Sequence, residues 1–201
     1  MAWGAIATWR MAHDGVIEAM HLLEKKGDAG DAVETLIKTV EDYPYYKSVG
    51  FGGLPNAEGI LEMDAAFMHG DTFEIGAVAG IIDVKNPISV ARKLSKDKFN
   101  SFRVGEGATK YSMLEGFERK SMLTERAHNI WEKRLKEIQE NNLNPYDGHD
   151  TVGAITLDQM GTMTAGTSSS GLFMKKPGRV GDSPLSLSLI HISEPTRLDV
   201  I

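Results

Sequence analysis

The stretch DGHDTVGAI, residues 147 to 155, contains the residues most suited to chemistry. A polar, turn-rich run ends in His149-Asp150, and Thr151 opens a predicted buried strand. A threonine hydroxyl is a weak nucleophile that needs a base beside it, and an internal amide nitrogen cannot take a proton. Cleavage of the Asp150–Thr151 bond would create an α-amine with a pKa near ~8, which is a suitable base. The junction is therefore a candidate self-cleavage site, with His149 and Asp150 assisting attack by Thr151 on its own preceding carbonyl.

The motifs of this chain also have structural interpretations. Asp150 would cap a turn and Thr151 would be a β-former. The glycine clusters at 50–53 and 105–107 lack the full dinucleotide fingerprint and the lysine of a nucleotide-triphosphate loop, so they are predicted to be tight turns. The six histidines include no HExxH-type pair, so a metal site has no support. The run GTSSSG, residues 166–171, lies between apolar strands, where its hydroxyls can face a site.

Composition excludes several classes of protein. The 201 residues, 41% hydrophobic and 25% charged, suffice for one globular domain or for part of a larger one. A net charge of -6 without a basic block argues against nucleic acid and membranes as partners. The absence of cysteine excludes disulfides, thiolate nucleophiles and cysteine-based zinc sites. With neither a signal-peptide pattern nor a membrane span, we expect a cytoplasmic protein, and we expect no cofactor.

Apolar periodicity predicts helices and strands in both halves of the chain. Strands are expected at residues 5–9, 61–68, 74–82, 102–104, 152–157, 163–168 and 172–175. Helices are expected at 16–23, at 33–40, after the Asn86-Pro87 cap, at 109–114 and at 121–140, where Ile130, Trp131, Leu135 and Ile138 face inward. A glycine-rich loop is expected at 48–59. Helices around strands indicate α/β or α+β layering.

Motifs spread over most of the chain form a specific signature: Ala7-Thr8-Trp9, SVGFGG (48–53), Met63-Asp64-Ala65, KNPISVAR (85–92), VGEGA (104–108), GHDTVGAI (148–155) and PGRVGDSP (177–184). They resemble glycosylasparaginase, the aspartylglucosaminidase branch of the N-terminal nucleophile hydrolases, in the asparaginase type 2 family. The related isoaspartyl peptidase and plant-type asparaginase branch usually has His-Gly-Thr where this chain has His149-Asp150-Thr151. That branch also lacks the early tryptophan, so both differences favour glycosylasparaginase. The resemblance implies an α+β fold, the four-layer αββα sandwich, incomplete in this chain.

The resemblance assigns roles to individual residues. Thr151 matches the nucleophile, and Ser169 takes the position of a nearby hydroxyl that is commonly threonine. Arg179 matches the group that holds the substrate's α-carboxylate, for which a planar guanidinium is well suited. Asp182 matches the partner of the α-ammonium, and Trp9 lines the pocket. Without the resemblance, Arg179 and Asp182 would be interpreted as a surface pair and Trp9 as a core residue.

The resemblance also divides the chain. Residues 1–150 correspond to the α-chain segment of a precursor, and residues 151–186 to the start of its β-chain with the nucleophile. Residues 187–201 match no element of the family, and LSLIHISEPTR resembles a translated sequencing-library adapter. We interpret this tail as an assembly artefact, the alternative being a natural divergent tail. The family's oxyanion-hole Thr-Gly pair comes well after the GDSP stretch, so the chain is expected to be truncated and inactive.

The resemblance predicts the activity of the parent protein. It would hydrolyse the amide between N-acetylglucosamine and asparagine, a small-molecule substrate, and its α- and β-chains would associate after self-cleavage, as a dimer of these pairs. The first alternative is an L-asparaginase or β-aspartyl (isoaspartyl) peptidase with the same aspartyl pocket. The second is a non-catalytic protein, an inactive truncated fragment.

Overall fold

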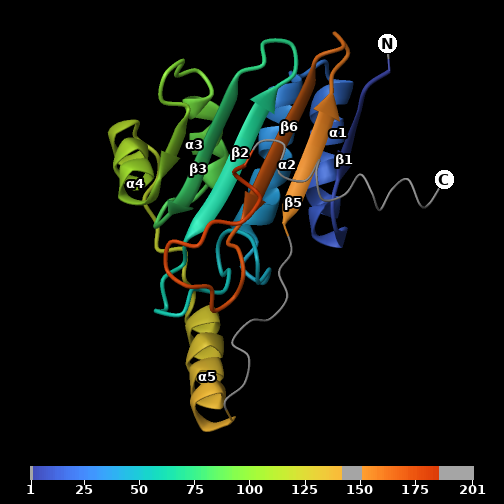
Figure 1. The fold of residues 1–201 in the computed structure, drawn as a ribbon. Coiled ribbons are helices and arrows are strands. Elements are labelled where there is room, and N and C mark those ends of the chain that lie inside the picture. The colour runs from blue at the N-terminus through green and yellow to red at the C-terminus, as the bar shows by residue number, and fades with distance from the viewer. Residues whose placement is uncertain (1, 142–150, 186–201) are drawn as a thin grey trace, which may run out of the picture.

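The computed structural model describes residues 2–141 and 151–185 of the chain (Figure 1). In chain order the elements are β1 (Gly4–Ala7), η1 (Arg10–Ala12), α1 (His13–Glu24), α2 (Ala29–Asp42), β2 (Met63–His69), β3 (Ile75–Ile81), α3 (Pro87–Leu94), β4 (Phe102–Val104), α4 (Gly105–Leu114), α5 (Glu125–Asn141), β5 (Val152–Leu157) and β6 (Met163–Ser169). His149, Asp150 and the tail from residue 186 lie outside the described residues. The predictions made for them therefore stay predictions.

The strands form one six-stranded sheet in the order β1-β5-β6-β2-β3-β4. Every neighbouring pair is antiparallel except β3 and β4. β5 and β6 are joined by a turn at the upper end of the sheet as drawn in Figure 1. At the opposite end, β2 and β5 begin while β1 and β6 end, and the loops that follow β6 and precede β2 gather there. We call this the lower end of the sheet.

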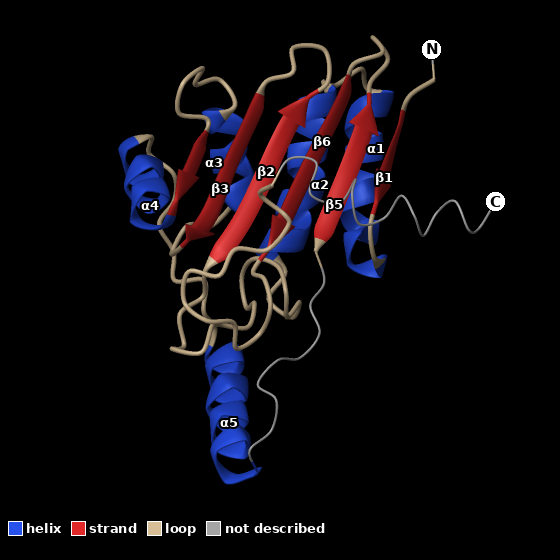
Figure 2. Cartoon of the chain, viewed as in Figure 1, coloured by secondary structure: helices blue, strands red, loops and turns tan. Residues whose placement is uncertain are grey.

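Helices α1, α2 and α3 cover one face of the sheet (Figure 2). The apolar residues Val33, Leu36 and Ile37 of α2 are fully buried, as their helical spacing predicts. At Gly166 of β6, an added Cβ would lie 2.7 Å from Cδ1 of Ile37, so this strand position needs glycine for α2 to approach. Close packing of this layer forms the main core of the molecule.

The other face of the sheet has no helical layer among the described residues (Figure 2). The register places Ile6 of β1, Ile155 of β5 and Met163 of β6 on this face, where they are 68%, 43% and 50% exposed. The α+β fold class is confirmed. The described residues supply one helical layer and one sheet of the expected four-layer sandwich.

Some element boundaries differ from those the sequence predicts. The first strand ends at Ala7 rather than at Trp9, because Trp9 has a φ of 62°, which breaks the extended backbone. Gly105 and Gly107 belong to the first turn of α4 and not to a tight turn. The tight turn expected at the other glycine cluster is confirmed, since Gly50 and Gly52 have positive φ.

Two local predictions were wrong. Residues 172–175 form no strand, because Phe173 and Met174 instead bury their side chains in a small cluster with Leu54. Asn86 precedes α3 as expected, but its side chain does not cap the helix. Its amide nitrogen donates instead to the Glu41 carboxylate at 3.2 Å, which ties α3 to α2.

Helix α5 projects from the lower end of the sheet (Figure 1). Its predicted inward face is confirmed, because four apolar residues pack against the small cluster: Ile130, Trp131, Leu135 and Ile138. The helix begins at Glu125 rather than at residue 121, where the Thr124 hydroxyl accepts the N–H of Ala127 at 3.2 Å. Within residues 2–141 and 151–185, no helix combines the length and apolar character needed to span a membrane.

Candidate active site

Thr151 lies immediately before β5, at the lower end of the sheet. The hydroxyl of Thr8 donates to the Thr151 carbonyl at 2.8 Å and accepts the N–H of Gly153 at 2.9 Å. The N–H of Thr8 in turn donates to the Gly153 carbonyl at 2.9 Å. These three bonds fix the backbone on either side of Val152. Thr151 is therefore held in place by a residue 143 positions earlier in the chain.

The Thr151 hydroxyl lies 3.3 Å from the hydroxyl of Ser183. Ser183 is held over the sheet because its carbonyl accepts the hydroxyl of Thr167 on β6 at 2.5 Å. Thr167 pairs with Gly153, two residues after Thr151, so strand alternation puts Thr151 and Thr167 on the same open face. The GDSP segment therefore crosses this face directly above the candidate nucleophile.

Ser169 ends β6 at the same end of the sheet. Val152 pairs with Ser168, so Thr151 and Ser169 occupy neighbouring positions on adjacent strands. Ser169 is buried, its hydroxyl accepts the N–H of Gly171 at 2.8 Å, and it approaches the Ser48 carbonyl at 3.4 Å. The structure thus places Ser169 next to Thr151 on the neighbouring strand.

Arg179 and Asp182 lie on the loop that follows β6 and leads into Ser183. Arg179 is exposed, and one of its guanidinium nitrogens would lie 3.4 Å from a Cβ added at Gly181. The carbonyl of Asp182 accepts the N–H of Leu185 at 3.0 Å, which makes a turn at the end of the loop. Because Ser183 contacts Thr151, this loop ends beside the candidate nucleophile.

Trp9 lies just past β1, one residue after the Thr8 that contacts Thr151. The interpretation of Trp9 as a core residue was wrong, because the residue is 62% exposed. Its positive φ turns the chain from β1 into η1, and a large side chain in that conformation is unusual. Trp9 is thus presented at the lower end of the sheet.

Three charged residues near this site escaped the sequence analysis. Asp64 on β2 is fully buried and pairs across the sheet with Ser169, while Lys175 is 1% exposed and lies 3.8 Å from a carboxylate oxygen of Glu62. Burial raises the pKa of Asp64, although Lys175 lowers it. Burial likewise lowers the pKa of Lys175, although Asp64 and Glu62 raise it. In the sequence, Asp64 belongs to the Met63-Asp64-Ala65 motif and is an aspartate inside the apolar strand MDAAFM, but no role was assigned to it.

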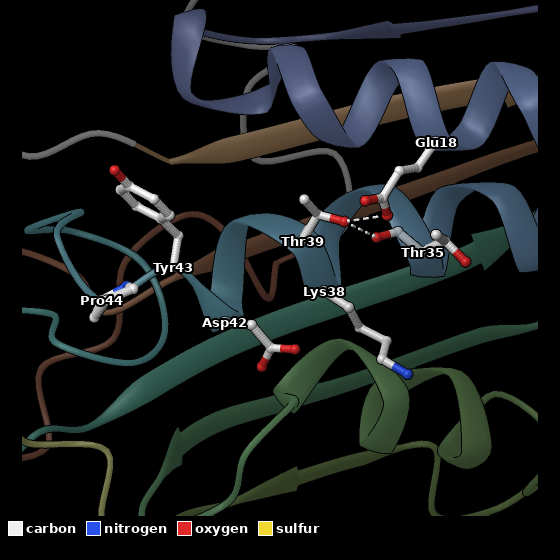
Figure 3. A pocket seen from close by; sticks show the side chains of 7 residues that line it. All are labelled: Glu18, Thr35, Lys38, Thr39, Asp42, Tyr43 and Pro44. Carbon is white, nitrogen blue, oxygen red and sulfur yellow. Dashed lines mark hydrogen bonds between the residues drawn. The ribbon is translucent and has the colours of Figure 1, made fainter.

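Neither of two surface hollows is lined by Thr151. One, of about 440 Å³, is on the outer side of the helical layer (Figure 3) and is lined by Glu18, Thr35, Lys38, Thr39, Asp42, Tyr43 and Pro44. The other, of about 490 Å³, is lined by Arg10, Met11, His13, Asp14 and Tyr46, and so begins one residue after Trp9. The first cannot be part of the Thr151 site, since the helical layer is on the opposite face of the sheet. No cluster of potential metal ligands occurs within the described ranges.

The chain matches known proteins along most of its length. The family profile described as "Asparaginase" matches residues 5–187. The chain is 38% identical over 180 residues to the N(4)-(Beta-N-acetylglucosaminyl)-L-asparaginase of Elizabethkingia miricola, which covers 90% of this chain and 53% of that protein. It is 42% identical over 174 residues to the plant-type L-asparaginase of Thermococcus kodakarensis, and this match covers 80% of the chain and 56% of that protein.

A third relative is the isoaspartyl peptidase/L-asparaginase of Rattus norvegicus, 34% identical over 170 residues, with 83% of this chain and 51% of that protein covered. The chain spans about half the length of the curated relatives it matches.

Proposed function

Because the chain belongs to the asparaginase family of N-terminal nucleophile hydrolases, we propose that its full-length gene product is an amidohydrolase with Thr151 as its nucleophile. The observation that carries this proposal is the position of Thr151. It opens β5 at the lower end of the sheet, beside Ser169 and beneath the segment that follows Arg179. The substrate we propose is N-acetylglucosaminyl-asparagine, whose amide would be cleaved to release aspartate.

Self-cleavage precedes this activity. The Thr151 hydroxyl attacks the carbonyl carbon of Asp150, and the peptide C–N bond breaks as its nitrogen takes up the hydroxyl proton, which leaves an ester and a free α-amine on Thr151. Water then hydrolyses the ester, which releases the carboxylate of Asp150 and restores the threonine hydroxyl. Within the described residues, the hydrogen-bond partner of the Thr151 hydroxyl is another hydroxyl, which is no base near neutral pH. An α-amine with a pKa near ~8 would supply the missing base. The bonds from Thr8 would keep the new chain end in register with β1.

The hydrolytic cycle uses the same hydroxyl. Thr151 Oγ attacks the side-chain amide carbon of the substrate, and the hydroxyl proton moves to the α-amine of Thr151. The C–N bond then breaks, and the leaving amine takes up that proton. Water hydrolyses the aspartyl ester, which releases aspartate and restores the threonine hydroxyl.

Four further residues are proposed to bind the substrate. Arg179 would hold the α-carboxylate through its planar guanidinium, and Asp182 would hold the α-ammonium. Ser169 would present its hydroxyl beside the nucleophile, and Trp9 would line the pocket. Ser169 ends β6 beside Thr151, Arg179 and Asp182 lie on the loop that leads to Ser183, and Trp9 follows the Thr8 that contacts Thr151, which supports this assignment. The segments before and after residue 151 would remain associated as α- and β-chains, and two such pairs would form a dimer.

A second candidate function is an L-asparaginase or isoaspartyl peptidase. The observation that favours it is the 42% identity to a plant-type L-asparaginase, which exceeds the 38% identity to the glycosylasparaginase relative. The same aspartyl pocket would serve either activity, since the candidates differ in the leaving group. The residue before the nucleophile favours the first candidate, because Asp150 stands where the second branch usually has glycine.

Competing substrates distinguish the candidates. The full-length gene product should hydrolyse glycosyl-asparagine faster than asparagine or an isoaspartyl dipeptide, measured as kcat/KM for each. Analogues with a blocked α-carboxylate or α-amine should react poorly, because the site would then hold an unpaired charge. Faster turnover of asparagine or the dipeptide would support the second candidate. If the blocked analogues were hydrolysed as fast as glycosyl-asparagine, the proposed binding of the α-carboxylate by Arg179 and of the α-ammonium by Asp182 would be contradicted.

A further inference from the structure

A buried group of charges lies beneath the loop that carries Arg179. Asp64 is fully buried, Lys175 is 1% exposed and the Glu62 side chain is 13% exposed. Glu62 immediately precedes β2, Asp64 is the second residue of that strand, and Lys175 follows β6. Burying charges is costly unless they are paired and hydrogen-bonded, so such a group requires an explanation.

Each carboxylate binds the backbone of the Arg179 loop. Glu62 Oε1 accepts the N–H of Gly178 at 2.9 Å, and Asp64 Oδ2 approaches the N–H of Gly181 at 3.4 Å. These two glycines flank Arg179 and its neighbour. The loop is therefore bound immediately before and two residues after the arginine, in both cases by an acidic side chain at the start of β2.

The second oxygen of each carboxylate is attached to the scaffold. Asp64 Oδ1 accepts the N–H of Gly80 at the end of β3 at 2.8 Å. Glu62 Oε2 accepts the side-chain amide of Asn56 at 3.1 Å. Each carboxylate thus bridges the Arg179 loop to a second segment, and it resists displacement of the loop from either side.

Lys175 supplies the neutralising charge. Its ammonium lies 3.8 Å from Glu62 Oε2 and approaches the Glu62 carbonyl at 3.4 Å, and its charge lowers the pKa of Asp64. The Lys175 side chain has room for its ammonium group because residue 171 is glycine, where an added Cβ would lie 3.1 Å from the ammonium nitrogen. The positive charge of Arg179 also lowers the pKa of Lys175, so the arginine lies within the electrostatic field of this group.

We propose that Glu62, Asp64 and Lys175 are positioning residues that hold the loop at residues 178–181 and so direct Arg179 toward the α-carboxylate of an aspartyl substrate. This inference rests on the proposed function, since it assumes that Arg179 binds that carboxylate. The three residues act through the loop and do not touch the reacting atoms. Their removal should therefore weaken recognition of the carboxylate more than it slows the chemical step.

The test is the Asp64→Asn variant of the full-length gene product. Asparagine can still accept the N–H of Gly80, but it turns an amide toward the N–H of Gly181. The inhibition constant of L-aspartate should rise roughly 10- to 100-fold, because a small misplacement of a positioning group costs about that much. The inhibition constant of the α-amide of aspartate should not change, because this compound lacks the α-carboxylate that Arg179 is proposed to bind. The variant's KM for glycosyl-asparagine should rise more than its kcat falls.

Asp158→Asn is the matched control. Asp158 is also buried and also holds a loop through backbone N–H groups, at the opposite end of the β5–β6 hairpin. It should leave both inhibition constants unchanged. If Asp64→Asn does not fold or self-cleave, Glu62→Ala provides the same test, with Glu62→Gln, which keeps an acceptor for Gly178, restoring aspartate binding.

The outcomes separate the two proposals. A wild-type protein that hydrolyses no aspartyl amide would overturn the proposed function and this inference with it. The inference alone would be overturned if the wild type is active and the Asp64→Asn or Glu62→Ala substitution changes the inhibition constants of aspartate and of its α-amide by the same factor. A selective loss in Asp158→Asn would overturn it as well, since general destabilisation would then explain the effect.

Discussion

At the upper end of the β5–β6 hairpin, the Asp158 carboxylate accepts the backbone N–H groups of Ala29, Met160 and Thr162. At the lower end, the Thr151 hydroxyl meets another hydroxyl, and the buried hydroxyl of Ser170 has no hydrogen-bond partner within the described residues. Satisfied polar groups are the rule in folded proteins. The buried hydroxyl of Thr164, near the upper end, likewise has no partner within the described residues. The two ends therefore differ in the satisfied carboxylate of Asp158 at one and the hydroxyl pair of Thr151 and Ser183 at the other.

The charges differ between the two ends in the same way. The carboxylate of Asp158 lies at the first residue of α2, where the helix dipole stabilises a negative charge. At the lower end, Asp64 on β2 and Lys175 on the loop after β6 are both buried, and the charge of Lys175 lowers the pKa of Asp64. Buried charge that local structure does not require is typical of sites that bind or react. Substitutions at the two ends should accordingly have different consequences.

The largest expected effect is that of Thr151→Ala on activity. Removal of a nucleophile that acts with its base costs about 10⁶-fold in kcat in well-studied hydrolases, so we expect no measurable hydrolysis of any aspartyl amide. The free energy of unfolding should be nearly unchanged, because Thr151 is half-exposed. Thr162→Ala, at the upper end of the hairpin, is the control and should retain full activity. Residual hydrolysis by Thr151→Ala above that of a blank would contradict the nucleophile assignment.

Lys175→Met should produce the largest loss of stability. The substitution leaves the buried carboxylate of Asp64 and the nearby Glu62 without their neutralising charge, which typically costs about 3–5 kcal/mol. Chemical denaturation of the variant measures this loss. Lys176→Met, at the exposed neighbouring position, should change stability little. Equal stability of the two variants would show that the buried charges are not coupled.

The buried carboxyl of Glu41, on helix α2, should make the free energy of unfolding depend on pH. The pKa of Glu41 is raised to about 8, because burial, with a smaller contribution from the nearby Asp42, outweighs the hydrogen bonds from Ser168, Ile88 and Asn86. The folded state therefore binds this proton more tightly than the unfolded state, whose pKa is 4.5. Its stabilisation is complete below pH 4.5 and is lost as the pH rises through about 8.

We expect the free energy of unfolding to fall with rising pH across that window, by at most about 1.4 kcal/mol per pH unit from this one group. Glu41→Gln should flatten the profile, whereas Glu18→Gln, at an exposed position on α1, should leave it unchanged. Thermal unfolding at a series of pH values measures both. A Glu41→Gln profile as steep as that of wild type would show that Glu41 does not hold the proton.

Apart from the control substitutions, Asp158→Asn should have the smallest effect. The asparagine can keep its bonds to Met160 and Thr162 but loses the charge at the start of α2, so we expect a loss of about 1–3 kcal/mol. Because this end of the hairpin is structural, kcat and KM should match those of wild type below the melting temperature. A change in either constant would remove the distinction between the two ends.

Sequence patterns predicted the elements better than the contacts between them. The helical spacing of Val33, Leu36 and Ile37 indicated which face of α2 is buried, because that pattern is local. The strands at residues 152–157 and 163–168 were predicted for the same reason. The strand expected at residues 172–175 failed because Phe173 and Met174 are buried against α5, a tertiary effect that local β-propensity does not contain.

In the candidate site, too, residues within motifs were predicted from the sequence, whereas contacts between distant segments were not. Thr151, Ser169 and Arg179 were predicted through motifs; Thr151 and Ser169 occupy neighbouring strand positions, and the loop that carries Arg179 leads to Ser183, which contacts Thr151. The role of Thr8 was not identified, because its bonds to the start of β5 span more than a hundred residues. The pairing of Lys175 with Glu62 has a comparable separation of 113 residues. Contacts of this range depend on sheet order, which a single sequence does not reveal.

The most direct test of the central claim is N-terminal sequencing of the full-length gene product after purification. If Thr151 is the nucleophile, a denaturing gel should show two chains, and the smaller should begin with Thr-Val-Gly-Ala. Thr151→Ala should then give one intact chain. An intact single chain that still hydrolyses glycosyl-asparagine would contradict the account, because Thr151 would then have no α-amine to act as its base.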